Sequence, residues 1–173
     1  MLNAVSQHHH RRIPLVGLNA GTLGYLHNDG SITELEERLE RGLYRLYRQP
    51  LLHVEFTTQD GLTRNAHTFN EAFLRAVGDQ AAWMRVVIDG VEQFGRLVGD
   101  GLMVSTPAGS TGWAYALGAT SVMIGTSQVI LTADAATHND RRWVSAPLPM
   151  HATRRGRGAG RREAPHAPGL ERP

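Results

Sequence analysis

Hydrophobic residues change their spacing twice along this chain of 173 residues. Residues 13–18, IPLVGL, form a short apolar run that is typical of a strand buried on both faces of an α/β sheet. Residues 31–41 then repeat apolar positions at helical spacing, and after Gly42 apolar and polar residues alternate with a period of two. The pattern therefore predicts the end of an α/β unit, one helix, and a run of antiparallel strands.

The predicted helix has start and stop signals. Ser31 and Glu34 fit a capping box, and Gly42 follows the last turn as a left-handed terminator. Its apolar stripe, which we expect to be buried, consists of Ile32, Leu35 and Leu39. The glycine turn NAGTLG at 19–24 stands where the carboxyl end of the preceding strand could present a ligand loop.

The strands predicted by the alternation are separated by tight turns. Residues 52–57 form the first strand, and after the turn at 59–61 a second one runs from Leu62 into Asn70 and Glu71. Residues 83–88 and 91–98 form the next hairpin around Asp89-Gly90. This hairpin delivers Asp100 at its end.

The most informative stretch is GDGLMVSTPAGSTGWAY at 99–115, and Asp100 is its second residue. Gly99 and Gly101 flank Asp100, and we expect these two glycines to provide backbone freedom for positive φ. Residues 102–104 read as an apolar strand, and residues 105–111 as a hydroxyl-rich loop that a ligand could approach. The stretch is either a nucleotide or sugar site or a hairpin arm with polar turns.

Weaker signals follow Leu117. Residues 121–132 have the β-branched content of strands, and residues 141–143 lead to a predicted proline turn at Pro147 and Pro149. Residues 151–173 hold six Arg against two Glu and few apolar residues, so a disordered basic tail is predicted. An RNA-binding tail and a merely solvated tail both stay open. We therefore divide the chain into an α/β remnant at 1–45, a β-rich domain at 46–150, and the tail.

The composition of the chain limits the classes of function to consider. Residues 1–150 hold twelve Arg against fourteen acidic residues, so the body of the protein does not suggest a nucleic-acid surface. The chain has no cysteine, no apolar run long enough for a membrane span and no signal-peptide pattern, so a cytoplasmic protein is expected. The run His8 to His10 is either a weak metal site or a solvated helix end.

Three groups of polar residues stand out on neighbouring predicted strands: Asn70 with Glu71, Asp100, and the hydroxyls around Thr111. Carboxylates and amides suit the diols of a ribose and the edge of an adenine. Asn70 and Glu71 are adjacent, so both can reach one ligand only at a strand end or a bulge.

Three blocks of the chain, in order, resemble the signature blocks of the NAD kinases: VGLNAGTLGYL at 16–26, FNEAFL at 69–74 and GDGLMVSTPAGSTGWAYAL at 99–117. The resemblance covers roughly residues 1–120 and implies an N-terminal Rossmann-like α/β domain followed by a β-rich, sandwich-like domain. It implies transfer of a phosphoryl group from ATP or polyphosphate to the 2′-hydroxyl of the adenosine ribose of NAD, which makes NADP. The implied cofactor is Mg²⁺ or another divalent cation bound with ATP, and the implied assembly is a homo-dimer or homo-tetramer.

The resemblance also implies an NAD-binding set. It comprises Tyr25, Asn70, Glu71, Asp100, Thr111, Gly112, Trp113, Ala114, Tyr115 and Ala116. The family's Gly-Gly-Asp-Gly motif, whose Asp is the general base, does not occur in this sequence. At Gly112 and Trp113 the family more often has a small residue followed by Tyr.

Two main hypotheses follow. The chain is an NAD kinase, incomplete at both ends and with little or no activity alone, or it is a non-catalytic nucleotide-binding or assembly module. A lipid kinase of the diacylglycerol-kinase type shares the fold class, but no sequence feature demands a lipid-accepting surface. Activity would need an acidic side chain that can act as the base for the ribose 2′-hydroxyl, and Asp100 is the one nearby candidate. We assign no catalytic residue and no metal ligand.

Overall fold

The computed structural model of the chain describes residues 1–22, 24–139, 141–150 and 154–158. Its helical elements are α1 (Leu2–His8), the 3₁₀ turn η1 (His9–Arg11), α2 (Ile32–Glu40) and α3 (Trp113–Ala116). Its strands are β1 (Leu52–Thr57), β2 (Thr63–Thr68), β3 (Glu71–Arg75), β4 (Ala82–Ile88), β5 (Val91–Gly99), β6 (Gly101–Ser105), β7 (Gln128–His138), β8 (Arg141–Pro149) and β9 (Arg154–Gly158). This order confirms the predicted class, part of an α/β domain followed by a β-rich domain, although the described residues before Leu52 form helices and no strand.

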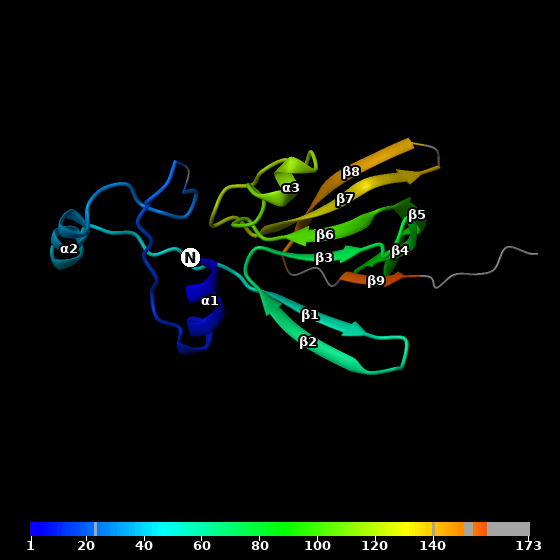
Figure 1. Ribbon diagram of the computed structural model, residues 1–173, viewed down its shortest axis with the longest axis horizontal. Helices are drawn as coiled ribbons and strands as arrows, with labels where there is room; N and C mark the ends of the chain where they lie inside the picture. The colour runs from blue at the N-terminus through cyan, green and yellow to red at the C-terminus, as the bar shows by residue number, and fades with distance from the viewer. Residues whose placement is uncertain (23, 140, 151–153, 159–173) are drawn as a thin grey trace, which may run out of the picture.

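The β-rich part is one antiparallel sheet with a separate hairpin beside it. Within the described residues the sheet has the order β3-β6-β7-β5-β4-β9, with β8 also paired to β7, while β1 and β2 pair only with each other. Figure 1 shows α2 at one end of the molecule, away from the sheet, α1 between α2 and the strand ends, and α3 next to β6 and β7.

A single run of chain, β5 followed by β6, organises this sheet. Val98 pairs with Thr137 and Gly101 pairs with Asp134, so both strands follow β7. Between them the Asp100 amide donates to the Asp134 carbonyl at 2.9 Å. The run changes its other neighbour at Asp100, because β5 pairs with β4 whereas β6 pairs with β3.

Gly99 and Gly101 are required here by packing and not by φ, which corrects the sequence-based reason. Neither has a positive φ. A Cβ on Gly99 would stand 2.8 Å from the Asp134 carbonyl oxygen, and one on Gly101 would stand 2.8 Å from the Leu74 carbonyl oxygen. The neighbouring strands approach too closely for any side chain at these two positions.

The core has two parts, one on each face of β6 and β7. On one face Leu102 and Leu131 pack with buried side chains of β4 and β5, namely Met84, Val86 and Leu97. On the other face Met103 and Ile130 pack under Ala114 of α3 and Ala119. Successive side chains of a strand point to opposite faces, so the apolar run at 102–104 is packed on both faces, which confirms the predicted apolar strand.

The helix α2 is confirmed at both ends but not on its predicted buried face. The capping box of Ser31 and Glu34 is complete, and Gly42 has φ +67°. The amide of Leu43 donates to the Arg38 carbonyl at 2.8 Å, which closes the helix as a Schellman motif. Ile32 is 66% exposed, however, and α2 contains no buried residue. The prediction of a buried stripe is wrong because no described element covers it.

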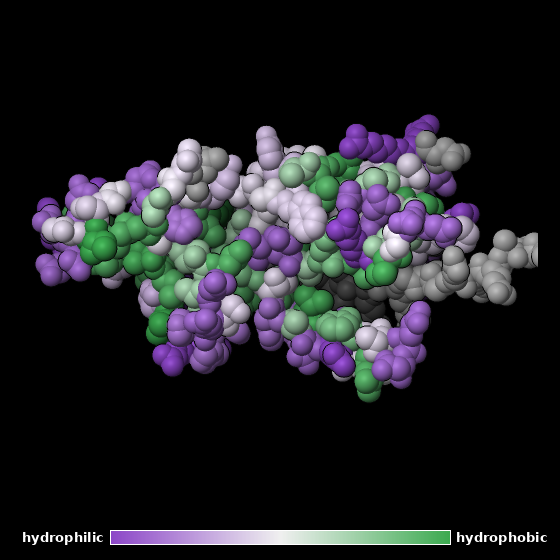
Figure 2. Space-filling view, viewed as in Figure 1, coloured by the Kyte–Doolittle hydropathy of each residue, from purple (hydrophilic) through white to green (hydrophobic). Residues whose placement is uncertain are grey.

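The predicted strand at 13–18 is also wrong. Residues 13–17 form no strand, Ile13 and Val16 are about half exposed, and Leu18 makes only an isolated parallel bridge to Asn28. No described strand lies beside residues 13–17 to accept their backbone hydrogen bonds. Figure 2 shows apolar surface at this end of the molecule, over α2.

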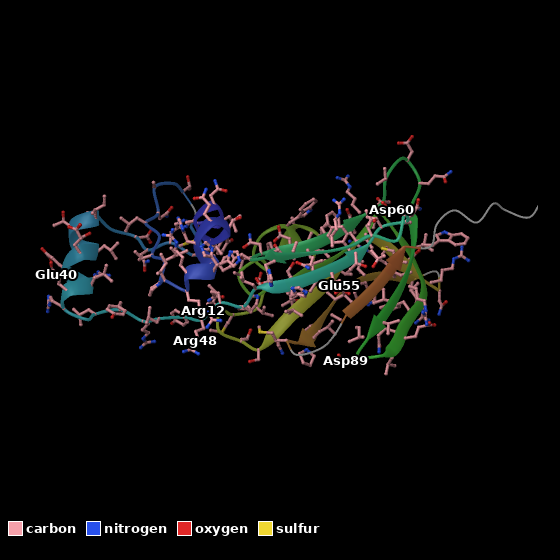
Figure 3. The ribbon with its side chains drawn as sticks, turned by 90° about the horizontal axis from the view of Figure 1, so that it is seen from below. Arg12, Glu40, Arg48, Glu55, Asp60 and Asp89 are labelled. Atoms are coloured by element: carbon pink, nitrogen blue, oxygen red, sulfur yellow. The ribbon has the colours of Figure 1, made fainter. Side chains whose placement is uncertain are left out.

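Other sequence predictions meet mixed outcomes. The turns at 59–61 and 89–90 are confirmed, with positive φ at Asp89 and Gly90 as a tight hairpin requires. Figure 3 shows Asp60 and Asp89 far from Glu40 of α2. Pro147 and Pro149 form no turn, because they lie in β8 opposite Ile130 and Gln128.

The predicted tail lies mostly outside the described residues. Within it, Arg154–Gly158 forms β9 and pairs with β4, so the prediction of disorder is wrong for these five residues. Residues 151–153 and 159–173 are not described. The boundary near residue 45 stays a prediction.

Substitution of Gly101 by alanine tests the packing of the central run. We expect it to lower the free energy of unfolding by about 1–3 kcal/mol, because a Cβ there meets the Leu74 carbonyl and the Phe73 ring. Gly95→Ala in β5 is the matched control, since its Cβ would meet only the flexible end of Glu92. Urea unfolding measures both, and equal stabilities of the two variants would contradict this account.

Candidate functional site

The loop after β6 is held together by its own hydroxyl groups. The Thr106 hydroxyl donates to the Phe69 carbonyl at 2.7 Å and accepts from the Gly109 amide at 3.2 Å. The Ser110 hydroxyl donates to the Pro107 carbonyl at 2.8 Å and accepts from the Val122 amide at 3.0 Å. Thr106 and Ser110 are fully buried. Their hydroxyls therefore shape the loop and are not free for a ligand.

This loop fixes the position of Asn70. The Thr106 amide donates to the Asn70 carbonyl at 2.8 Å, and Gly109 lies so close that a Cβ would stand 2.3 Å from the same oxygen. Only glycine allows this approach. The second and third sequence blocks, far apart in the chain, are thus joined through backbone atoms.

Asn70 and Glu71 lie at a strand end, which is one of the two positions where adjacent residues can both reach one ligand. Glu71 is the first residue of β3 and pairs with Ser105, while Asn70 precedes the strand. Both line a pocket of about 270 Å³, together with Leu2, Val5, Ser6 and His9 from the N-terminal helix and its extension. A ligand in this pocket would meet both side chains.

The polar groups of this pocket are not satisfied within the protein. Asn70 Oδ1 and Glu71 Oε2 are buried atoms without a hydrogen-bond partner in the described residues. Burial raises the pKa of the Glu71 carboxyl above its ordinary value. Buried polar atoms usually have partners, so these two atoms make the pocket a candidate site for a polar ligand.

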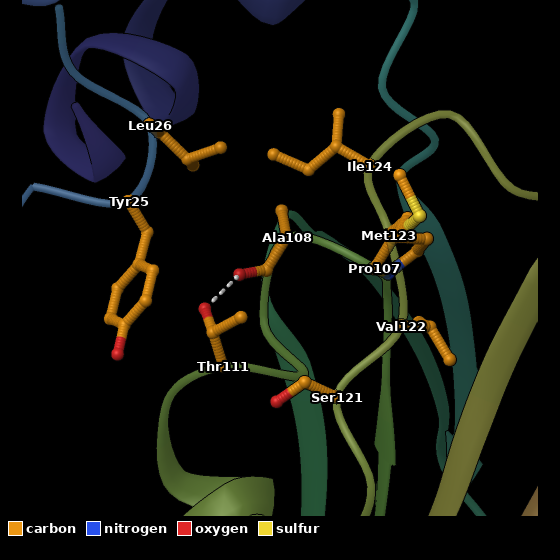
Figure 4. Close-up of a pocket in the computed structure, with 9 residues that line it drawn as sticks. All are labelled: Tyr25, Leu26, Pro107, Ala108, Thr111, Ser121, Val122, Met123 and Ile124. Carbon is orange, nitrogen blue, oxygen red and sulfur yellow. Dashed lines mark hydrogen bonds between the residues drawn. The ribbon is translucent and has the colours of Figure 1, made fainter.

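A second pocket, of about 290 Å³, lies between the first and third blocks. Figure 4 shows Tyr25 and Leu26 on one side of it and Ala108 with Thr111 beside them. The Thr111 hydroxyl is 3.5 Å from the Ala108 carbonyl, the longest hydrogen bond of the loop, and Tyr25 is 65% exposed. The structure thus brings Tyr25 and Thr111 to one pocket.

The residues from Gly112 to Ala116 divide into two kinds. Gly112 is the N-cap of α3, and Trp113, Tyr115 and Ala116 are exposed. Ala114 is fully buried in the core, so its side chain is closed to a ligand. The Trp113 ring packs edge-on against Phe73, with centroids 4.8 Å apart. Their roles as NAD contacts stay predictions.

Asp100 is not brought to the other predicted ligand residues. It lies at the start of β6, whereas Ser105, opposite Glu71, lies at its end. Asp100 directly precedes Gly101, and the five residue spacings from Asp100 to Ser105 put them roughly 17 Å apart. Asp100 is exposed and its side chain faces neither described pocket.

The sequence analysis missed the contribution of α1 to the first pocket. Residues 1–12 read as polar, yet Leu2, Val5, Ser6 and His9 recur at helical spacing and line one side of it. That spacing was the available signal. Among the described residues, no group of three or more His, Asp or Glu is arranged to hold a metal ion, and no helix is long and apolar enough to cross a membrane.

The arrangement has the fold of dinucleotide kinases. No protein-family model matches the chain. The crystal structure of yeast NADH kinase complexed with NADH superimposes with a TM-score of 0.72 at 20% identity, over 83% of this chain and 40% of that one. The NAD kinase from Archaeoglobus fulgidus in complex with ATP gives a TM-score of 0.67 at 24% identity, over 84% and 55%.

Curated relatives make the assignment more specific. The chain is 36% identical to an NAD kinase of Cereibacter sphaeroides over 153 residues, which cover 88% of this chain and 59% of the relative. It is 35% identical to that of Brucella suis, over 88% and 58%, and 30% identical to that of Rickettsia bellii, over 88% and 59%. The chain belongs to the NAD kinase family. It spans about three fifths of the length of the curated relatives it matches.

The raised pKa of Glu71 makes the stability of the protein depend on pH. A carboxyl whose pKa is higher in the folded state binds protons more tightly there, so stability falls as pH rises from the ordinary value of 4.5 through the raised one. Glu71→Gln removes this loss. We therefore expect the free energy of unfolding of the variant, relative to the parent, to be higher at pH 7 than at pH 4.

Urea unfolding at the two pH values measures this difference. Glu55→Gln, at an exposed position of β1, controls for the change in net charge. A relative stability of Glu71→Gln that does not change with pH, or changes no more than that of Glu55→Gln, would show that the Glu71 carboxyl is not desolvated.

Proposed function

We propose that the chain binds NAD between the two pockets and is the NAD-holding part of an NAD kinase. The observation that carries this proposal is the junction at Asn70, where two unsatisfied buried polar atoms stand beside a loop fixed by backbone contacts. Membership of the NAD kinase family supports NAD as the ligand. The solved relatives were crystallised with NADH and with ATP, in agreement with ligands of this class.

In the proposed reaction, the 2′-hydroxyl oxygen of the adenosine ribose attacks the terminal phosphorus of ATP or polyphosphate. The phosphorus–oxygen bond to the leaving phosphate breaks, and the hydroxyl proton passes to a base. Asn70 and Glu71 would bind and orient the dinucleotide. Such transfers depend on positioning and on stabilisation of the phosphate charges.

The described residues do not provide a complete catalytic set. Glu71 is the one carboxylate that lines either described pocket, and Asp100 lies at the far end of β6. Mg²⁺ or another divalent cation is proposed to bind with ATP, since such ions are held by substrate phosphates and one or two carboxylates, and we assign no protein ligand to it. We therefore propose that the chain alone has little or no kinase activity, and that it acts in the cytoplasm.

A non-catalytic nucleotide-binding module is the alternative function. The same observation favours it, because Asn70 and Glu71 line one pocket whereas Asp100, the one candidate base, lines neither described pocket. It predicts binding of NAD without turnover and without need of a further polypeptide. Addition of the remaining part of a related NAD kinase distinguishes the two proposals, since only the first expects NADP formation to appear.

Asn70→Ala tests the binding site directly. We expect the affinity for NAD to fall about tenfold or more, because the substitution removes a side chain that lines the pocket and whose Oδ1 has no partner among the described residues. Titration calorimetry of the full chain measures the affinity. Asn65→Ala, at an exposed position of β2, is the matched control.

NADP formation from NAD, ATP and Mg²⁺ is followed on the same preparation. Absence of binding to both NAD and ATP would overturn the proposed function. Robust formation of NADP by the chain alone would overturn its proposed inactivity and leave the binding site in place.

Asp100 is proposed to act from a neighbouring copy of the chain in a homo-dimer or homo-tetramer. Its exposure, and its distance from Asn70 along the chain's own β6, support this assignment. We expect Asp100→Ala to weaken NAD binding only at protein concentrations at which the chain self-associates. Calorimetry at two concentrations, with sedimentation to define the assembly, measures the effect.

The control is Asp79→Ala, an equally exposed aspartate in the connection between β3 and β4. Equal weakening by Asp100→Ala in the monomer and in the assembly would contradict the role across copies.

A further inference from the structure

Two histidines face each other across the β1–β2 hairpin, next to the site but outside the predicted NAD-binding set. His53 and His67 are directly opposite in the strand register. Their ring centroids are 4.9 Å apart, and His53 Nδ1 lies 3.2 Å from His67 Nε2. Both residues are exposed, and the contact between them is a hydrogen bond of two ring nitrogens outside any core.

The separation of the two nitrogens matches that of a metal chelate. Two imidazole nitrogens bound to one tetrahedral zinc ion, each at about 2.0–2.1 Å, stand about 3.3 Å apart. Imidazole is a preferred ligand of zinc and of the neighbouring divalent transition metals. We propose that His53 and His67 form a binding site for a zinc-like divalent ion, whose remaining coordination positions are filled by water.

The hairpin that carries the pair gains most from such an ion. β1 and β2 pair only with each other within the described residues, and most of their side chains are exposed. A two-stranded hairpin is marginally stable by itself. An ion held by one histidine from each strand would fix the register of the hairpin without a hydrophobic core.

The site also touches the candidate NAD pocket. His67 lines that pocket with Asn70 and Glu71, and its ring centroid lies 6.1 Å from that of His9, which lines the pocket from the other side. His9 Nδ1 is 3.2 Å from the carbonyl oxygens of Val5 and Ser6. Carbonyls only accept, so Nδ1 carries a hydrogen, and in a neutral ring with this tautomer the other nitrogen has the lone pair that a metal needs. A third imidazole therefore lies near His67, although the three histidines do not form a three-ligand metal group.

Zinc titration of the full chain tests the proposal. The parent for all variants carries His8→Gln and His10→Gln, which interrupt the adjacent histidines of the N-terminal run as a competing site. We expect calorimetry with zinc sulfate to show one ion per chain. His53→Gln and His67→Gln should each weaken its binding about tenfold or more, because each leaves a single ligand.

Nuclear magnetic resonance of the histidine rings provides a second readout. The signals of His53 and His67 should shift together on addition of zinc, whereas that of His138, which bonds the Arg96 carbonyl on the main sheet, should not. The pair is a hydrogen-bonded contact and not a metal site if zinc does not bind, or if it binds equally well to both single variants. The result is independent of NAD binding, so either proposal can fail without the other.

Discussion

The structure depends on one continuous run of chain that changes neighbours at Asp100 without leaving β7. The amides of residues 98–105 stay in register with one long strand, while the other edge passes from β4 to β3. Such a passage brings three strands close together at one point, and Gly99 and Gly101 are the two positions where their backbones nearly touch. Any side chain there would push the two halves of the sheet apart.

The position of the candidate site follows from that run. Because β6 is fixed on β7 along its whole length, the loop after Ser105 begins at a defined place beside the first residue of β3. Thr106 then bonds Phe69 and Asn70 through its side chain and its amide, and Gly109 allows the loop to lie directly on the Asn70 backbone. Backbone contacts of this kind are insensitive to side-chain motion, so the two blocks can hold a ligand in a preorganised geometry.

The features that the sequence predicted correctly are those that depend on interactions between residues close together in the chain. The capping box of Ser31 and Glu34, the positive φ of Gly42 and the Asp89-Gly90 turn each depend on a few neighbouring residues. Sequence reasoning failed where burial depends on a distant partner: the stripe of α2 and residues 13–18 are apolar but have no described element against them. Pro147 and Pro149 belong to the same case. β8 pairs with β7 on one side, so prolines on this strand are tolerated, whereas a local reading makes them a turn.

The candidate site was predictable to the same extent. Its residue types followed from the three blocks, but the separation of Asp100 from Asn70 followed only from the register of β6, which no local pattern reports.

The positions of the buried residues show which contacts stabilise the candidate site. No described residue among the first fifty is buried, while both core clusters lie between residues 73 and 148. The elements that hold Asn70 and the loop are thus stabilised by contacts within the β-rich part itself. The geometry of Asn70 and the loop therefore does not depend on a core in the N-terminal part, whose residues line one side of each pocket.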